Sequence, residues 1–298
     1  MADDGRVTGL VAAGGVAPAL APLTRGLPAA VLEVLDRPLL DHAVELLRRH
    51  GLDEVTVALG PLGPALAAAP PGDVVVLAGE VLSGADVSAL LAAHRAAGAV
   101  ATLGLVRPGA GMLRDAVVLD AADGRVVGVQ RDVDGDEALS DLAVSGLLVV
   151  GPAGRELLAG DPEALVTAAD LPEALLAHDA ACAGHVSAGA WAPVRTPQEL
   201  LAATWAALDG AFGPSAPGEA IADGVLVGPR VAFDGIELLE PPLWLGRDVR
   251  VGARTRLLGP VAVGAGARIG AGCTLRGCVV LPGAVVPNGI VLLGGTFA

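Results

Sequence analysis

The stretch "VRVGARTRLLGPVAVGAGARIGAGCTL", residues 249–275, has an aliphatic residue at every sixth position. The same period continues on both sides of it, in one unbroken phase. A second small or branched residue falls four positions after most of these residues, and glycine often follows them directly. This pattern is typical of hexapeptide coils, in which aliphatic side chains fill the interior of a triangular stack. It predicts a left-handed parallel β-helix of hexapeptide repeats, with interior positions at Ile221, Val227, Phe233, Leu239, Leu245, Val251, Leu257, Val263, Ile269, Leu275 and Leu281.

Two of the three cysteines lie in this repeat. Cys273 falls on the second interior position of its hexad, so we expect a small buried hydrophobe there. Cys278 is off both interior positions of the same phase, which predicts an exposed or corner thiol.

The residues before the repeat alternate between strand and helix patterns. Val7–Ala12 and Asp73–Gly79 are short apolar runs, as expected for buried strands. Pro38–His50 and Ala85–Ala97 have apolar residues at helical spacing. This alternation predicts an α/β fold, a Rossmann-like and mostly parallel sheet with helices on both faces. Glycine, proline and serine crowd together after Gly210. The sequence therefore predicts an α/β domain over residues 1–210, a linker over 211–220 and the β-helix over 221–298.

The composition restricts the partners and the compartment. The net charge is −14, which argues against nucleic acid or an anionic membrane as a partner. No apolar run reaches the 18 residues of a membrane span, and the first residues lack the features of a signal peptide. Three cysteines without metal-like spacing are typical of a reduced compartment, so we expect a cytoplasmic protein. All 19 basic residues are arginine, which excludes chemistry that needs a lysine.

A glycine pair follows the first predicted strand. Gly14 and Gly15 stand where phosphate-binding loops begin, which makes them the candidate nucleotide-binding residues. Such loops bind anions through converging backbone N–H groups. Pro18 has no N–H to donate, so the loop keeps the shape of a phosphate-binding loop but loses part of its chemistry.

An α/β layer with this loop, followed by a hexapeptide helix, resembles the sugar-1-phosphate nucleotidyltransferases. Mannose-1-phosphate guanylyltransferases and glucose-1-phosphate thymidylyltransferases are the members that it is most similar to. The stretch "GHVSAGAWAPVRTP", residues 184–197, resembles the family's closing Trp-x-Asp-x-Gly-Thr-Pro segment. The family's opening motif is matched at Ala13, Gly14, Gly15, Leu20, Pro22, Leu23, Thr24 and Pro28.

The charged residues of the family's motifs are replaced. By this resemblance, Ala19 stands in place of the motif arginine, Ala29 in place of its lysine and Pro193 in place of a metal-binding aspartate. Glu80 stands where the family has the other aspartate, so it is the candidate metal ligand. Arg25 and Arg131 are the candidate cationic substitutes at the catalytic site.

The family's reaction is attack of a sugar-1-phosphate oxygen on the α-phosphate of a nucleoside triphosphate. Its transition state is stabilised mainly by fixed positive charge and Mg²⁺. The three replacements predict a catalytically degenerate chain, a regulatory or structural subunit in nucleotide-sugar metabolism that needs no cofactor. Its candidate ligand is a nucleotide or a sugar phosphate. Its candidate macromolecular partner is a second copy or an active paralogue.

Two other functions are considered. In the first, the chain is an active nucleotidyltransferase whose rebuilt site uses Mg²⁺, Arg25, Arg131 and Glu80. In the second, the hexapeptide coils belong to an acyltransferase, which would use a histidine base on those coils. No histidine occurs after His185, and this argues against acyl transfer.

Overall fold

The computed structural model describes residues 6–109, 112–133, 137–160, 165–213 and 216–298. Two compact units are present. Unit 1 comprises Met1–Gly15 and Leu40–Trp191, and unit 2 comprises Val16–Leu39 and Ala192–Ala298. This division by contacts groups residues 16–39 with the C-terminal part of the chain. The boundaries predicted around residues 211–220 stay a prediction, and residues 214–215 of that linker lie outside the described residues.

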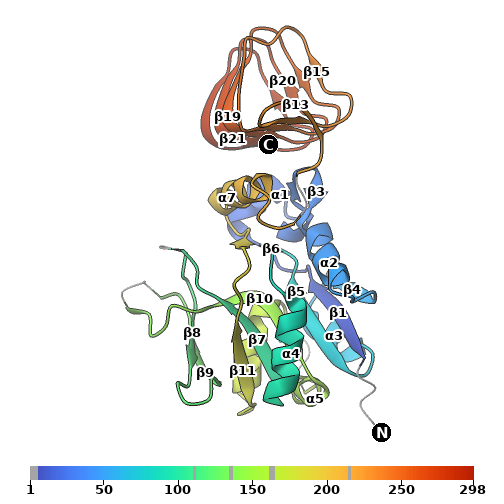
Figure 1. Ribbon diagram of the computed structural model, residues 1–298, viewed down its shortest axis with the longest axis vertical. Coiled ribbons are helices and arrows are strands. Elements are labelled where there is room, and N and C mark those ends of the chain that lie inside the picture. Colours follow the sequence, from blue (N-terminus) through green and yellow to red (C-terminus); the bar gives the residue numbers. More distant parts are fainter. Residues whose placement is uncertain (1–5, 110–111, 134–136, 161–164, 214–215) are drawn as a thin grey trace. The chain divides into compact units, whose positions relative to one another are not determined.

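Unit 1 is built on a six-stranded sheet with the order β11-β7-β10-β5-β1-β4 (Figure 1). Strands β1, β4 and β5 pair in parallel, as do β7 and β11. Only β10 runs antiparallel, to both of its neighbours. The expected α/β fold with a mostly parallel sheet is therefore confirmed. The strands are β1 (Val7–Ala12), β4 (Val55–Ala58), β5 (Asp73–Ala78), β7 (Ala101–Val106), β10 (Ala143–Val150) and β11 (Cys182–Val186), with the short β6 at Val81–Ser83.

Helices cover both faces of this sheet. Buried side chains of α3, α5 and α6 form one apolar cluster with one set of strand residues. Side chains of α2 and α4 form a second cluster with the alternate strand residues, such as Val75 and Leu77. Because successive strand residues point to opposite faces, the two clusters lie on the two sides of the sheet. The helices are α2 (Leu39–Arg49), α3 (Leu62–Ala68), α4 (Val87–Ala97), α5 (Pro152–Leu158) and α6 (Leu171–Leu176), with the 3₁₀ turn η5 at Ala168–Asp170.

A separate antiparallel hairpin, β8 (Ala116–Leu119) and β9 (Val126–Gln130), is also part of unit 1 (Figure 1). Gly124 in its turn has φ +72°, a left-handed conformation that glycine adopts without strain. Arg131 comes directly after β9, so the hairpin determines where this candidate residue lies.

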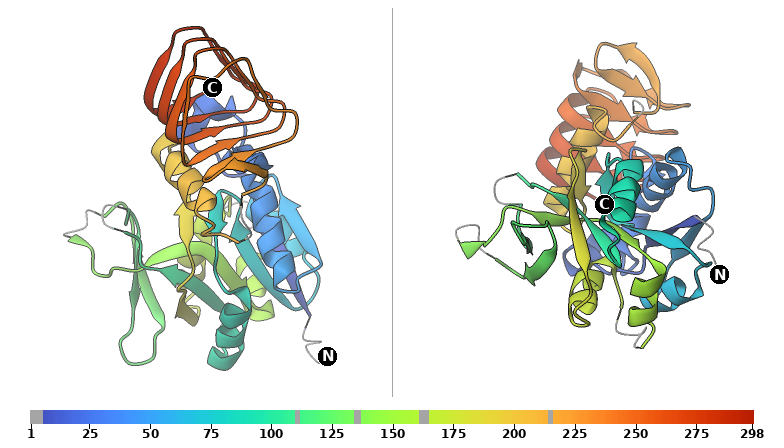
Figure 2. Two further views of the ribbon diagram at one scale, coloured as in Figure 1. Left: turned by 45° about the horizontal axis from the view of Figure 1, so that its top comes forward. Right: turned by 60° about the horizontal axis from the view of Figure 1, so that its bottom comes forward.

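The main part of unit 2 is a stack of short parallel strands. Successive coils pair with an 18-residue spacing, as in Val225↔Leu243↔Val261. The coils are drawn in orange and red in Figure 2, and their interior is filled by buried aliphatic side chains. This arrangement is consistent with a parallel β-helix. The parallel strands are β14 (Val225–Val227), β15 (Ala232–Phe233), β16 (Leu238–Glu240), β17 (Leu243–Leu245), β18 (Arg250–Val251), β19 (Arg256–Val263), β20 (Arg268–Ile269), β21 (Thr274–Val280), β22 (Val285–Val286) and β23 (Val291–Phe297). The strand before them, β13 (Glu219–Ala222), pairs antiparallel with β14. The predicted interior position at Ile221 was therefore wrong, and this side chain is 48% exposed.

The prediction for Cys278 was wrong, because the six-residue phase does not continue to the end. The corner of one coil contains Gly259 and Pro260, whereas the matching corner of the next coil contains Gly277 alone. From that point every interior position shifts by one residue. Cys278 is therefore buried in the core at 1% exposure, while Val285, which the unbroken phase places inside, is 61% exposed. Cys273 is buried, as expected.

Residues 16–39 form the other part of unit 2, together with a helix. They contain the 3₁₀ turns η1 (Pro18–Leu20) and η2 (Ala29–Val31), the one-turn helix α1 (Ala21–Thr24), and the hairpin β2 (Glu33–Val34) and β3 (Arg37–Pro38). Strand β12 (Trp191–Pro193) leads to helix α7 (Pro197–Leu208). Thr196 caps α7 by accepting the N–H of Glu199.

Asp36, in the turn of the β2–β3 hairpin, connects this segment to the coils. Its Oδ2 accepts the N–H of Arg247 at 2.9 Å, and its Oδ1 accepts the N–H of Ala265 at 2.7 Å. A side chain at Gly246 would collide with this carboxylate and would have to displace it from these two hydrogen bonds. One aspartate thus joins two successive coil corners to residues 16–39.

We predict that Asp36→Ala destabilises the protein by about 2 kcal/mol, because two hydrogen bonds to a carboxylate are lost. Burial raises the pKa of Asp36 against the effect of these two bonds, and relief of that desolvation limits the loss. Asp36→Asn keeps one acceptor and should lose about half as much. Urea unfolding followed by circular dichroism measures both changes. An Asp36→Ala variant with the wild-type midpoint would show that the carboxylate does not hold the segment.

Candidate functional site

The carboxyl edge of the sheet brings three of the predicted site residues together. Strands β1 and β5 are parallel neighbours, and the N–H of Gly79 donates to the carbonyl of Ala12 at 2.8 Å. Gly14 and Gly15 follow β1, and Glu80 follows β5 in a half-buried turn. Ligands of open α/β sheets bind at this edge. The glycine pair and the candidate metal ligand therefore follow adjacent strands at one edge of the sheet in unit 1.

Packing alone explains one of the two glycines. A β-carbon at Gly14 would overlap the backbone carbonyl of Gly60, which follows β4. A β-carbon at Gly15 would lie 3.4 Å from Cγ2 of Thr167, an ordinary contact. Gly14 is therefore required by the close approach of two strand ends, whereas the space around Gly15 admits a larger residue. The nucleotide-binding role of both residues stays a prediction.

The loop after the glycines has few hydrogen-bond donors that could bind an anion. It turns into η1, in which Pro18 has no N–H and the N–H of Leu20 donates to Ala17 at 2.9 Å. Ala19, at the position of the family's arginine, is exposed and carries only a methyl group. Of the three residues in this turn, Pro18 and Leu20 therefore have no free backbone N–H for a phosphate. The side chains of the turn are apolar and offer no hydrogen-bond donor in their place.

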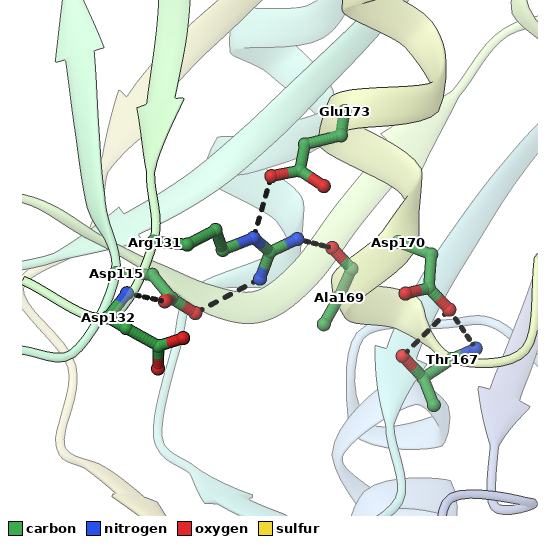
Figure 3. Close-up of polar contacts among 7 residues, drawn as sticks. All are labelled: Asp115, Arg131, Asp132, Thr167, Ala169, Asp170 and Glu173. Atoms are coloured by element: carbon green, nitrogen blue, oxygen red, sulfur yellow. Dashed lines mark hydrogen bonds and ion pairs between the residues drawn. The ribbon is translucent and has the colours of Figure 1, made fainter.

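Arg131 is held by unit 1 itself (Figure 3). Its Nε donates to Glu173 at 2.7 Å, its Nη1 to Asp115 at 3.0 Å and its Nη2 to the carbonyl of Ala169 at 2.9 Å. The Glu173 carboxylate, with further help from Asp115, raises the pKa of this guanidinium. All three guanidinium nitrogens have acceptors, so the charge is already neutralised by two carboxylates. This network makes Arg131 a tie between the hairpin and α6.

The same network ends close to the glycine loop. Thr167, whose methyl group faces Gly15, begins the turn η5. Asp170 accepts the Thr167 N–H at 2.7 Å and its hydroxyl at 3.1 Å, which fixes the turn (Figure 3). The side of the loop that faces Thr167 is therefore a packed and hydrogen-bonded surface.

Two other positions matched to charged residues of the family, Ala29 and Pro193, lie in unit 2, as does the candidate substitute Arg25. Ala29 is buried at 1% exposure, so a lysine at this position would have to displace packed atoms. Pro193 is buried in β12. Arg25 is exposed and ends α1 with φ 54°. Of these positions, only Arg25 presents a cation.

The residues at the matched positions do not fit the two-carboxylate magnesium site that the resemblance implies. Mg²⁺ prefers several oxygen ligands in octahedral geometry. Glu80 provides a carboxylate, but Pro193 provides none. Within the described ranges, no group of three or more His, Cys, Asp or Glu side chains is placed to hold a metal ion.

A cavity of about 400 Å³ opens at the same edge, where β7 and β11 end. Its lining includes Arg107, Met112, Ser187 and Trp191. The indole N–H of Trp191 donates to the carbonyl of Ser145 at 2.9 Å, which fixes the ring. Arg107 lies 2.9 Å from Asp141 in an exposed ion pair. The cavity offers an aromatic wall and one partly neutralised cation, which suits a small polar ligand better than a polyphosphate. Trp191 lies in the stretch that resembles the family's closing segment, but the sequence indicated neither a site role for it nor the cavity.

Comparisons with known proteins find the following similarities. No family model matches the chain. A UTP–glucose-1-phosphate uridylyltransferase of Synechocystis is 22% identical, over 95% of this chain and 82% of that protein. A mannose-1-phosphate guanylyltransferase of Mycobacterium tuberculosis is 26% identical, over 91% of this chain and 83% of that protein.

A solved structure gives the same result for the fold. It is a Bacillus anthracis protein described as a glucose-1-phosphate thymidylyltransferase, in complex with sucrose. It matches with a TM-score of 0.59 and 15% identity, over 70% of this chain and 98% of that one. The resemblance of this chain to the sugar-1-phosphate nucleotidyltransferases is thus confirmed along most of its length. Among the described residues, no helix has the length and apolar character that crossing a membrane requires.

Proposed function

We propose that this chain is a catalytically degenerate relative of the sugar-1-phosphate nucleotidyltransferases, acting as a regulatory or structural subunit in nucleotide-sugar metabolism. The main support for the proposal is a contrast between two groups of motif residues: the uncharged residues that shape the site are present, and the positively charged ones are replaced. Gly14, Gly15 and Glu80 meet at the correct edge of the sheet, while the motif arginine and lysine are Ala19 and Ala29. Transfer of a nucleotidyl group needs fixed positive charge around the phosphates.

The engagement of Arg131 supports this proposal over the active alternative. A rebuilt site would need this guanidinium to leave Asp115 and Glu173 before it could approach a substrate. Breaking the network would also leave two carboxylates close together without their cation. The resemblance implies a Mg²⁺ cofactor for the active alternative, and the proposed degenerate chain needs none.

The proposed ligand is a sugar phosphate or a nucleotide sugar, bound weakly beside Trp191 in the cavity at the ends of β7 and β11. In this proposal the coils form a left-handed β-helix of hexapeptide repeats. The α/β domain spans residues 1–210 and the β-helix domain spans residues 221–298. The proposed setting is the cytoplasm, and the proposed partner is a second copy or an active paralogue.

A pyrophosphate-release assay tests the proposal. The degenerate chain predicts no release above background for triphosphates offered together with sugar-1-phosphates. The active alternative predicts substrate-dependent turnover that disappears in Glu80→Ala. Turnover near 1 s⁻¹, ordinary for an enzyme, would refute the proposed degeneracy.

A further inference from the structure

The charges of this protein are divided unequally between its two units. Unit 1 contains 23 acidic residues and 9 arginines, so it carries the whole net charge of −14. Unit 2 contains 10 of each and is neutral overall. Within unit 2 no acidic residue follows Asp248, and five arginines do. The last coils are therefore basic on a strongly acidic protein.

These five arginines, which we call the arginine face, are all exposed and come from two sides of two successive coils. They are Arg250, Arg254, Arg256, Arg268 and Arg276. Arg250 and Arg268 lie in the sheet of β18 and β20, Arg256 and Arg276 lie in the sheet of β19 and β21, and Arg254 lies in the turn between β18 and β19. Arg250 pairs in register with Arg268, and Arg276 lies opposite Leu258, two residues after Arg256. Neighbouring strands are about 4.8 Å apart, so like charges are held side by side.

The protein itself neutralises only part of this charge. Arg256 lies 4.0 Å from Glu237 of the preceding coil. Arg250 lies within electrostatic range of Asp248, which is paired with Arg230. Arg254, Arg268 and Arg276 have no acidic partner in the part of the chain that the structure describes. Such stacked charges repel each other, and an acidic surface from outside relieves that repulsion.

Apolar side chains border Arg256 and Arg276 on their side of the coils. Leu238 pairs in register with Arg256, Val291 with Thr274 and Leu293 with Arg276. These three side chains are 41%, 62% and 71% exposed. Arginine set among exposed aliphatic side chains is typical of protein–protein interfaces, where apolar contact removes water from the charges.

We propose that the arginine face binds the acidic unit 1 of a second copy of this chain. Each chain carries both the basic arginine face and the acidic unit 1. Two copies therefore attract each other in a head-to-tail orientation, with the arginine face of one against unit 1 of the other. Such a contact joins two different surfaces and closes into a ring or extends into a chain. This inference deepens the assembly part of the proposed function. Its test measures association of the chains rather than enzymatic turnover, so the proposed contact and the proposed loss of activity can each be refuted without the other.

Light scattering coupled to size exclusion, at about 100 µM protein, tests this contact. In 20 mM NaCl we expect a mass well above the 29.3 kDa of one chain, and in 500 mM NaCl the mass of one chain. Salt should act this strongly because the screening length falls from about 20 Å to about 4 Å between these conditions. The double variant Arg268→Glu/Arg276→Glu should be monomeric in 20 mM NaCl, with a dissociation constant raised at least ~100-fold. Circular dichroism checks that the variant is folded.

A matched control places the same change of charge elsewhere. Arg48 and Arg114 are exposed residues of unit 1, and Arg48→Glu/Arg114→Glu makes that unit more acidic. This control should still associate. A wild-type chain that stays monomeric in 20 mM NaCl overturns the proposal. So does association that survives reversal of Arg268 and Arg276, or that is lost equally in the control.

Discussion

Pyrophosphate release by this protein should be at least ~10⁴-fold slower than by an ordinary enzyme of its fold. Typical turnover is about 10 s⁻¹, so the expected rate is below about 10⁻³ s⁻¹. Removal of one charge-stabilising donor costs roughly 3 kcal/mol, more than a hundredfold in rate. By the resemblance to the family, Ala19, Ala29 and Pro193 stand in place of the arginine, the lysine and one carboxylate. These groups act as a unit, so their separate costs do not simply add.

The assay should use the substrate pairs suggested by the relatives: UTP or dTTP with glucose-1-phosphate, and GTP with mannose-1-phosphate. The Mycobacterium tuberculosis guanylyltransferase, under the same conditions, is the positive control for the last pair. Release at 1 s⁻¹ with any pair contradicts the expectation. The Glu80→Ala variant then decides whether this carboxylate takes part in the activity.

Gly14→Ala should destabilise the protein by about 3 kcal/mol. The added β-carbon meets the carbonyl, the carbonyl carbon and the α-carbon of Gly60, all of which are backbone atoms. A backbone cannot rotate away as a flexible side chain does, so β1 and β4 must separate locally. Those two strands are hydrogen-bonded neighbours at the edge of the sheet, and Ala13 also donates to Ala58 at 2.8 Å. Urea unfolding followed by circular dichroism measures the loss.

Gly15→Ala is the matched control for this experiment. The same methyl group is added one residue later, where its nearest neighbour is a side-chain methyl at 3.4 Å. We expect a change within about 0.5 kcal/mol for this variant. Equal destabilisation by the two substitutions would show that the approach of Gly14 to Gly60 is not what requires glycine in this loop.

Local patterns predicted much of the fold. The six-residue period indicated the coils because each hexad from Val227 to Leu275 places its aliphatic side chain inward, whereas Ile221, before the first coil, is exposed. It failed at Gly277, where deletion of one corner residue shifts the interior without changing the composition. Helix α3 was also missed. Its sequence, "LGPALAA", contains a proline and lacks a polar face, so neither propensity nor periodicity indicates a helix.

Only those residues of the candidate site that directly follow a strand could be predicted from the sequence. Gly14 and Glu80 follow two apolar runs, and parallel pairing brings such ends together. The network of Arg131 was not predictable, because its partners are 16 and 42 residues away in the sequence and join it only through the packing of the hairpin on α6. The same holds for Asp36, whose contacts span more than 200 residues.

The central claim is that the loop after β1 has the fold of a phosphate-binding loop but does not bind phosphate tightly. A calorimetric titration of the protein with a nucleoside triphosphate and Mg²⁺ tests it most directly. The account predicts a dissociation constant of about 1 mM or weaker, unchanged when Mg²⁺ is omitted, because Ala19 and Ala29 supply no positive charge and Pro193 supplies no second carboxylate for the metal. Micromolar binding that requires Mg²⁺ and weakens in Arg25→Ala or Glu80→Ala would contradict it.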